Sequence, residues 1–542
     1  MQKILYNAKV YVEKGNYQEA VLIEDGTIKA VGSNGDIYHA ADSSRLVKSI
    51  DCEGRTLVPG FNDTHMHLMM LGETRNQAQI EGVKSISQMI DICRRFEKNH
   101  PDVYKKGMHA IGWNQDLFTD EHRLPDRHDL DQISTEYPIV LERICGHIVS
   151  VNSRAIEMLN LPDDTHGMKE GDFLFGDDGL PNGIFTGNGC NVAKNLIPDF
   201  TMEERRRIVR ETMDYAASEG VTSVQSNDVG TTIMDRPGAF KLFRDLYRNG
   251  EGKIRYRHQV SFSSLEQFRD SLEHGEYTSD EYPENSRLTL GPLKLFKDGS
   301  LGARTALMTN GYVGDRDNHG LEWLSAEDMD RFCILAKENN MQVVTHCIGD
   351  EAVKQTIDSY EKAFINGKNK LRHALIHCQI TDESLIRRIV KDDILVFAQP
   401  IFIDYDMTIL EDLVGKELAS TSYAFGTLIR KGAHVSYGTD SPVEDCNPFP
   451  NIYMAVTRKN KNGLPEEGFY PKERVDVETA VDAYTIESAY GEFMENVKGR
   501  IKPGYYADMV LLDRDIFTCD PEEIKAIHPV LTMVDGEVVY EE

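Results

Sequence analysis

The sequence predicts an α/β fold: a parallel (β/α)8 TIM barrel with a small composite β-sandwich domain and an insert after barrel strand 1. Three observations lead to this prediction. Short β-rich segments that end in polar residues recur along the chain with helical patterns between them. Hairpin-like sequence occurs at both ends of the chain. One interval between two of the segments is far longer than the others.

The predicted barrel strands begin with an apolar run, Thr56–Leu68, that passes through a Pro-Gly bend. Helical patterns fill several intervals, and the pattern after Ser325 opens with an N-cap serine three residues before an acid. Repeated alternation of strand and helix is typical of a parallel barrel. The further predicted strands are Gly220–Asp228, Ile254–Phe262, Gly291–Gly299, Met341–His346, His373–His377, Ile394–Pro400 and His434–Asp440.

The two ends of the chain carry the signature of antiparallel hairpins. Asp25-Gly26 separates two alternating apolar runs near the start, and Asp535-Gly536 does the same near the end. Isolated hairpins are marginally stable, so we expect the two ends to form one β-sandwich. The predicted boundaries are residues 1–57 and 497–542 for the sandwich and 58–496 for the barrel.

The long interval follows the first barrel strand. About 150 residues separate it from the second strand, which is too long for a loop. The interval has strand-like runs of its own, Met108–Trp113 and Pro138–Arg143. We therefore expect an inserted subdomain at about residues 75–200. Because barrel active sites lie at the C-terminal ends of the strands, this insert would shape the substrate pocket.

Composition narrows the classes of partner. The chain has 542 residues, 40% of them hydrophobic, and a net charge of −29. Such an acidic excess repels phosphate backbones and anionic lipid, so we expect neither nucleic-acid nor membrane binding. We expect a cytoplasmic protein, since no signal peptide or long apolar span is recognisable. The nine cysteines occur singly, which is typical of reduced thiols.

Five side chains are candidate metal ligands because they fall at the ends of predicted strands. His65 and His67 alternate along the first strand and so face the same side. His346, His377 and Asp440 end three later strands. An isolated His-x-His pair is more often structural than metal-binding. In a barrel, however, these strand ends converge on one mouth, where distant residues can share an ion.

These residues carry a resemblance to a known family. The run Pro59-Gly60-Phe61-x-Asp63-x-His65-x-His67, the two later histidines and Gly438-Thr439-Asp440 resemble the amidohydrolase superfamily of metal-dependent hydrolases. Three further motifs are similar to the branch of YtcJ-like amidohydrolases and N-substituted formamide deformylases. These motifs are Gly299-Ser-Leu-Gly-Ala-Arg304, Thr345-His346-Cys-Ile-Gly349-Asp350 and Gly112-Trp113-Asn114.

The resemblance implies a role for each candidate ligand. His65 and His67 would bind one ion, His346 and His377 a second, and Asp440 would contact the first while acting as the catalytic base. Members with two ions bridge them with a lysine whose amine has reacted with CO2, and Lys294 matches that position. A carbamate suits two cations, whereas an ammonium would be repelled. Lys297 is the second choice, and an unmodified Lys294 paired with an acid is the structural alternative.

The resemblance also implies an activity. The expected reaction is hydrolysis of a C–N bond, as in an amide or a formamide, of a small molecule by a metal-activated water. Deamination or ester hydrolysis by the same machinery, and a non-catalytic scaffold, are the alternatives. Zinc is the expected metal, as one or two ions, and manganese and iron also suit these ligands.

Other residues are candidates for substrate contact. Trp113 could form an apolar wall, and Arg143 and His147 lie in a segment that resembles a pocket-lining part of the family. Arg304 follows the glycine-rich loop after the fourth strand. Each could equally be structural, as a loop anchor or a core residue. We expect a small-molecule substrate as the ligand, and a homodimer is compatible with the sequence.

Overall fold

The computed structural model describes residues 2–42, 44–101, 103–161, 163–169, 171–231, 234–275 and 287–542. The chain forms two compact units. The first, called here the barrel unit, comprises Met1–Met70 and Val209–Glu542. The second, the inserted unit, comprises Leu71–Ile208.

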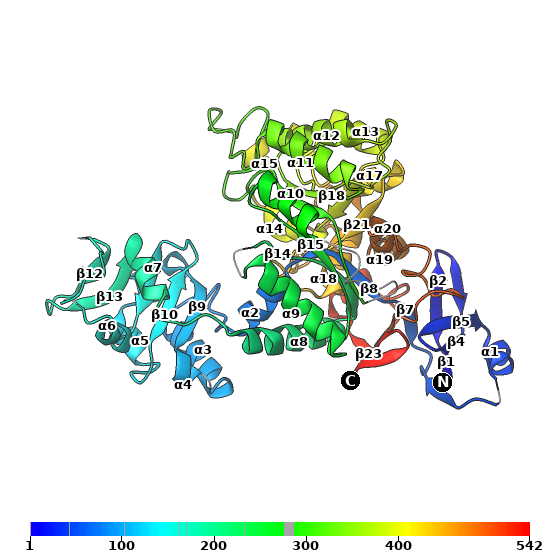
Figure 1. Cartoon of the computed structure of the whole chain (residues 1–542), viewed down its shortest axis with the longest axis horizontal. Helices are drawn as coiled ribbons and strands as arrows, with labels where there is room; N and C mark the ends of the chain where they lie inside the picture. The colour runs from blue at the N-terminus through cyan, green and yellow to red at the C-terminus, as the bar shows by residue number, and fades with distance from the viewer. Residues whose placement is uncertain are drawn as a thin grey trace. The chain divides into compact units, whose positions relative to one another are not determined.

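The barrel unit contains the predicted parallel barrel. Eight strands lie side by side in the order β21-β20-β19-β18-β17-β15-β14-β8, and every pairing along this path is parallel (Figure 1). Each strand overlaps one of the eight segments predicted from the sequence, with β14 and β18 each ending one residue later than predicted, so the predicted fold class is confirmed. The strands are β8 (Phe61–Met66), β14 (Val221–Val229), β15 (Arg255–Val260), β17 (Leu293–Phe296), β18 (Val343–Cys347), β19 (Ala374–His377), β20 (Leu395–Ala398) and β21 (Val435–Tyr437).

The first and last strands, β8 and β21, meet through hydrogen bonds between their ends. The amide of Asp440 donates to the carbonyl of His65 at 2.8 Å, and the amide of His67 donates to the carbonyl of Ser441 at 2.7 Å. The hydroxyl of Thr64 donates to the carbonyl of Tyr437 at 2.9 Å. Three of the candidate ligands therefore lie where the first and last barrel strands come together.

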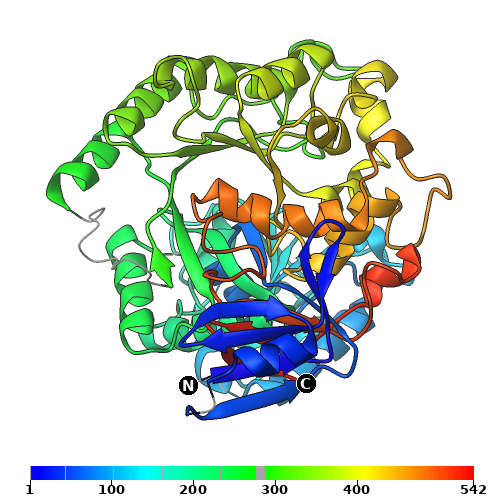
Figure 2. The same ribbon diagram turned by 90° about the vertical axis from the view of Figure 1, so that its right-hand side faces the viewer.

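Helices cover the outside of the barrel, as the green to yellow segments of Figure 2 show. Helix α11 begins after Ser325, whose hydroxyl accepts from the amide of Asp328, so the predicted N-cap is confirmed. No helix in the described ranges has the length and apolar character needed to cross a membrane. The main helices are α8 (Met202–Ser218), α9 (Arg236–Arg248), α10 (Leu265–His274), α11 (Ala326–Glu338), α12 (Asp350–Ala363), α13 (Glu383–Lys391), α17 (Phe425–Arg430), α18 (Pro448–Thr457), α19 (Val477–Ala483) and α20 (Ile486–Gly491).

Both ends of the chain build the small β domain, as predicted. One sheet has the order β5-β4-β1-β6, and the other has the order β24-β23-β22-β7-β2-β3 and mixes strands from the two ends. In Figure 1 the blue and red strands accordingly lie in one region. The strands are β1 (Gln2–Tyr6), β2 (Lys9–Glu13), β3 (Asn16–Gln18), β4 (Ala20–Glu24), β5 (Thr27–Gly32), β6 (Val47–Asp51), β7 (Thr56–Pro59), β22 (Met509–Leu512), β23 (Pro529–Val534) and β24 (Glu537–Glu541).

Gly60 marks the passage from the β domain to the barrel. Strand β7 ends at Pro59 in the composite sheet, and β8 begins at Phe61 in the barrel. A Cβ atom at Gly60 would lie 2.1 Å from the hydroxyl oxygen of Thr222, closer than any side chain tolerates. Only glycine allows the first two barrel strands to approach at this point.

The inserted unit has a five-stranded sheet of its own, in the order β12-β13-β11-β10-β9. The two runs predicted as strands in this region are β9 and β10. Trp113, at the end of β9, is fully buried in the core of the unit. The main elements are α3 (Ile86–Asn99), β9 (Met108–Trp113), α5 (Arg127–Asp131), β10 (Ile139–Arg143), β11 (Ile148–Val151), α6 (Ser153–Met158), β12 (Phe173–Phe175), β13 (Pro181–Thr186) and α7 (Asn188–Lys194).

Candidate metal centre

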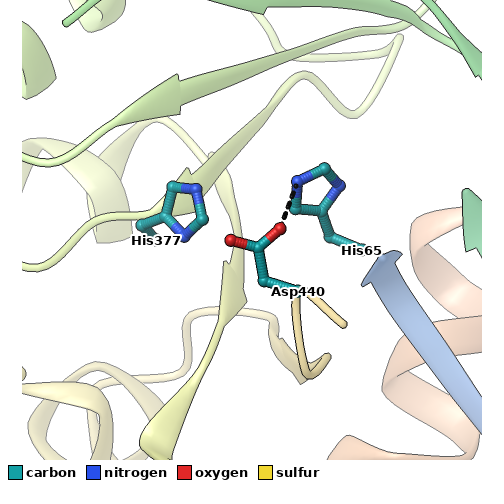
Figure 3. Close-up of side chains that lie close together, drawn as sticks. All are labelled: His65, His377 and Asp440. Atoms are coloured by element: carbon teal, nitrogen blue, oxygen red, sulfur yellow. Dashed lines mark ion pairs between the residues drawn. The ribbon is translucent and has the colours of Figure 1, made fainter. Parts of the chain in front are cut away.

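The five predicted ligands come together at the C-terminal ends of the barrel strands. Ligand atoms of His65, His377 and Asp440 all lie within 4.8 Å of one another, and Figure 3 shows the three side chains pointing toward a common point. The ring centres of His65 and His67 are 5.2 Å apart, and those of His346 and His377 are 4.5 Å apart. Strands separated by hundreds of residues thus supply one cluster.

Asp440 lies between the imidazoles of the first strand. Its Oδ1 atom is 3.3 Å from Nε2 of His65 and 3.3 Å from Nε2 of His67. That oxygen is buried and makes no hydrogen bond with any described residue. An unsatisfied buried acceptor beside two ring nitrogens is the arrangement that a shared cation would complete.

Three of the histidines are held by acceptors on the far side of the ring. Nδ1 of His65 lies 2.7 Å from Oε1 of Gln259, and Nδ1 of His377 lies 2.8 Å from Oε1 of Gln399. Nδ1 of His67 lies 2.8 Å from the carbonyl oxygen of Asn227. Each acceptor places the proton on Nδ1 and leaves the Nε2 lone pair free for a metal.

His346 has the opposite arrangement. Its Nε2 atom lies 3.0 Å from the carbonyl oxygen of Gly299, so Nε2 carries the proton and Nδ1 is the available ligand atom. The carboxylate of Asp298 is 3.6 Å from the same nitrogen. Asp298 also accepts from the amides of Ile348 and Gly349, which fixes the turn that follows β18.

The backbone at two of the ligands adopts an unusual conformation. His377 has φ 72° and Asp440 has φ 56°, in the left-handed region that residues with a Cβ atom seldom occupy. Asp63 anchors the second of these positions, because its carboxylate accepts from both the amide and the hydroxyl of Thr439. Such conformations cost energy and are concentrated at functional sites.

Lys294 lies beside these ligands, and Lys297 does not share their contacts. Nζ of Lys294 is 3.5 Å from Nε2 of His65 and lies 4.5 Å from the ring centre of Phe296. No ion pair of Lys294 occurs among the described residues, although the side chain is buried. Lys297 instead donates to the carboxylate of Glu322 at 2.6 Å.

Burial and neighbouring charges together set the protonation of these side chains, and Asp440 raises the pKa of His67 against the effect of burial. Desolvation lowers the pKa of Lys294 to about 7 and that of His377 to about 4. Burial alone would raise the pKa of Asp440, but the imidazoles of His67 and His65 hold it below its usual range. The aspartate is therefore ionised and the histidine neutral near pH 7, as metal ligands must be.

The four predicted substrate contacts lie in two places. Trp113, Arg143 and His147 belong to the inserted unit. The indole N–H of Trp113 donates to the carbonyl of Leu141 at 2.9 Å within the core, whereas His147 is exposed.

Arg143 and Arg304 differ in their surroundings. Arg143 donates to Gln115, Asn114 and Asp116 inside the inserted unit. Arg304 is exposed on the loop after β17, in the barrel unit.

Sequence reasoning did not identify four residues beside the ligands. Gln259 and Gln399 were within predicted strands, at the same strand-end level as the histidines that they contact. Their positions near the ends of predicted strands could have identified both glutamines as neighbours of the histidines. Trp323 and Phe402, whose rings stack on His346 and His377, lie in connecting segments where the sequence has no periodic pattern.

Comparison with known proteins places the chain among hydrolases. A family model described as "Amidohydrolase family" matches residues 48–540. The chain is 29% identical to the "Putative amidohydrolase YtcJ" of Bacillus subtilis, with both chains covered completely. It is 23% identical to the "N-substituted formamide deformylase" of Arthrobacter pascens over 99% of this chain and 97% of that protein.

A solved structure agrees with these relatives. The crystal structure of an uncharacterised metal-dependent hydrolase from Pyrococcus furiosus superposes with a TM-score of 0.76 at 27% identity. The match covers 96% of this chain and all of the other. With the barrel, the clustered histidines and a family match over most of its length, the chain belongs to the amidohydrolase family of metal-dependent hydrolases.

Proposed function

We propose that the chain hydrolyses a C–N bond of a small amide or formamide with the help of divalent metal held by the clustered side chains. The observation that carries the proposal is the position of Asp440, whose Oδ1 lies 3.3 Å from Nε2 of both His65 and His67. The similarity to an enzyme named N-substituted formamide deformylase supports the choice of bond.

The donor set fits a divalent ion. His65, His67 and Asp440 would hold one ion, and His346 and His377 a second, with Lys294 between them as a carbamate. Imidazole and carboxylate suit zinc, and also manganese or iron. A carbamate would give Lys294, a buried amine without an ion pair among the described residues, an anionic group that suits two cations.

The residues of the chain then divide the reaction between them. A bound divalent ion supplies a water of lowered pKa and polarises the scissile carbonyl. Asp440 takes a proton from the attacking water and returns it to the leaving nitrogen, so that one carboxylate serves both steps. Gln259 and Gln399 keep the histidine rings oriented while charge changes at the site.

Metal analysis combined with a substrate panel tests the proposal. Protein purified and supplemented with Zn, Mn or Fe is expected to bind stoichiometric metal and to release amine from N-substituted formamides. Ammonia release from ring amines would instead indicate a deaminase, and alcohol release from esters an esterase. Absence of stoichiometric metal after supplementation would contradict the proposal and favour a scaffold.

An Asp440→Asn variant tests the base. Turnover is expected to fall by roughly 10²–10⁴-fold, the usual contribution of a positioned acid–base group. Much of the metal should remain bound, because the histidines and an amide oxygen are still present. Normal turnover in this variant would exclude Asp440 as the base.

A further inference from the structure

An exposed tryptophan stands beside the candidate ligands. Trp323 exposes 58% of its surface, yet its indole lies nearly parallel to the imidazole of His346, at 8° and with ring centres 6.2 Å apart. The ring centre of Phe296 lies 6.3 Å from that of Trp323 and 5.8 Å from that of His346. Two aromatic rings therefore lie beside one of the proposed ligands.

A second aromatic ring flanks the neighbouring ligand. Phe402, in the short 3₁₀ helix Pro400–Phe402 after β20, stacks on His377 at 5.9 Å and 18°. Since His346 and His377 are themselves 4.5 Å apart, apolar rings accompany both ligands assigned to the second ion. The ligands assigned to the first ion, His65 and His67, instead have Asp440 between them.

Lys297 fixes the segment that carries Trp323. The backbone amide of Trp323 donates to the carbonyl of Lys297 at 2.9 Å. The ammonium of Lys297 donates to the carboxylate of Glu322 at 2.6 Å and to the carbonyl of Leu324 at 2.6 Å. One completely buried lysine thus holds the residues on both sides of the tryptophan.

The exposure of Trp323 is unusual for its residue type. Tryptophan is highly buried on average, and an exposed indole forgoes the burial that usually stabilises it. The other tryptophan of the chain, Trp113, is fully buried with its N–H bonded. Binding sites for small molecules are lined by aromatic rings with a few placed polar groups, which is the composition found here.

We propose that Trp323 is a specificity-determining residue that binds a planar, apolar substituent of the substrate, and that Lys297 is its positioning residue. The inference rests on the proposed function, because the substituent would be attached to a substrate carbonyl that binds close to His346 and His377. Trp323 would select aromatic amides over short alkyl amides. Trp323 provides the contact surface, and Lys297 fixes where that surface stands.

Two hydroxamates that chelate metal test the inference without requiring turnover. Benzohydroxamate carries a phenyl ring, and acetohydroxamate carries a methyl group in its place. Calorimetric titration of the zinc-loaded protein is expected to show benzohydroxamate binding about tenfold more tightly, the scale of an aromatic contact with added apolar burial. Trp323→Ala should remove most of this difference, leave acetohydroxamate affinity unchanged, and be largely rescued by Trp323→Phe.

The positioning role of Lys297 has its own readout. Lys297→Met should weaken benzohydroxamate and spare acetohydroxamate and zinc content. In a Trp113→Phe background, where Trp323 is the sole indole, it should also increase quenching of fluorescence by acrylamide. Tyr38→Ala, which removes another exposed aromatic ring of the barrel unit, serves as the control and should change neither measurement.

The outcomes separate this inference from the function on which it rests. If neither hydroxamate binds in a zinc-dependent manner, the proposed metal centre is wrong and the inference falls with it. If both bind with equal affinity, or if Trp323→Ala keeps the tenfold ratio, the inference is overturned while the proposed function stands. Unchanged affinity and quenching in Lys297→Met would overturn the positioning role.

Discussion

The side-chain oxygen of Gln259 lies 2.7 Å from Nδ1 of His65, while the nitrogen of the same amide donates to the carbonyl of Thr64 at 2.9 Å. The second contact fixes which end of the amide faces the ring. His65 must therefore carry its proton on Nδ1 and present Nε2 to Asp440. Gln399 repeats the device at His377, since its nitrogen donates to the carbonyl of Phe397.

Gln259→Leu and Gln399→Leu are each expected to weaken metal binding by about 10–100-fold, the usual effect of losing a partner that orients a ligand. Competition with a chromogenic chelator measures this affinity. Gln355→Leu is the control, because that amide bonds Glu351 on α12. Equal affinities in all three variants would show that the amides do not orient the rings.

Lys294→Met is expected to reduce bound metal from two ions to one, because it removes the group proposed to bridge them. Lys297→Met is the matched control on the same strand end and should keep both ions. In the wild type, native mass spectrometry should detect the added mass of CO2 on Lys294. An unmodified amine in protein that holds two ions would exclude the bridge.

Trp113→Ala is expected to destabilise the inserted unit by about 3–5 kcal/mol. The substitution leaves a cavity at a fully buried site and removes the hydrogen-bond donor of the Leu141 carbonyl. Trp113→Phe should cost less because it keeps most of the packing. Hydrogen exchange of β9 and β10 measures the change. Full protection in the alanine variant would contradict a core role, and altered substrate affinity without loss of protection would support the wall predicted from sequence.

His434, which lies outside the candidate metal centre, is expected to make the free energy of unfolding depend on pH. Burial opposes its charge, but the carboxylate of Glu487, 2.7 Å from Nδ1, raises the pKa above its usual value of 6.5. The pair therefore stabilises the fold fully below about pH 6 and loses this contribution as pH rises through the folded-state pKa.

The free energy of unfolding, measured with urea, should accordingly be higher for wild type than for His434→Gln at pH 6, by under about 1 kcal/mol. The difference should shrink toward pH 8. A difference that grows with pH would contradict the raised pKa.

Local patterns accounted for the barrel and its candidate ligands. Period-two alternation placed His65 and His67 on one face, and polar strand ends marked His346, His377 and Asp440 before any contact was known. The Pro-Gly bend recognised in the first apolar run lies where β7 ends and β8 begins.

What the sequence did not reveal depends on contacts between distant segments. Nothing local distinguishes the amide of Gln259 from an ordinary polar strand residue, because its partner is 194 positions away. Trp113 was considered as a pocket wall, and its core position depends on packing by several strands of the inserted unit. The position of Trp323 beside His346 depends on the course of a loop.

The meeting of β8 with β21 also sets when the site can exist. The proposed base and the first histidine belong to segments so distant that Asp63 and Thr439, which tie them together, are 376 positions apart. The eighth strand must therefore be synthesised before an ion can bind His65, His67 and Asp440 at the same time. Metal uptake during synthesis would accordingly mark the moment at which the ring of strands closes.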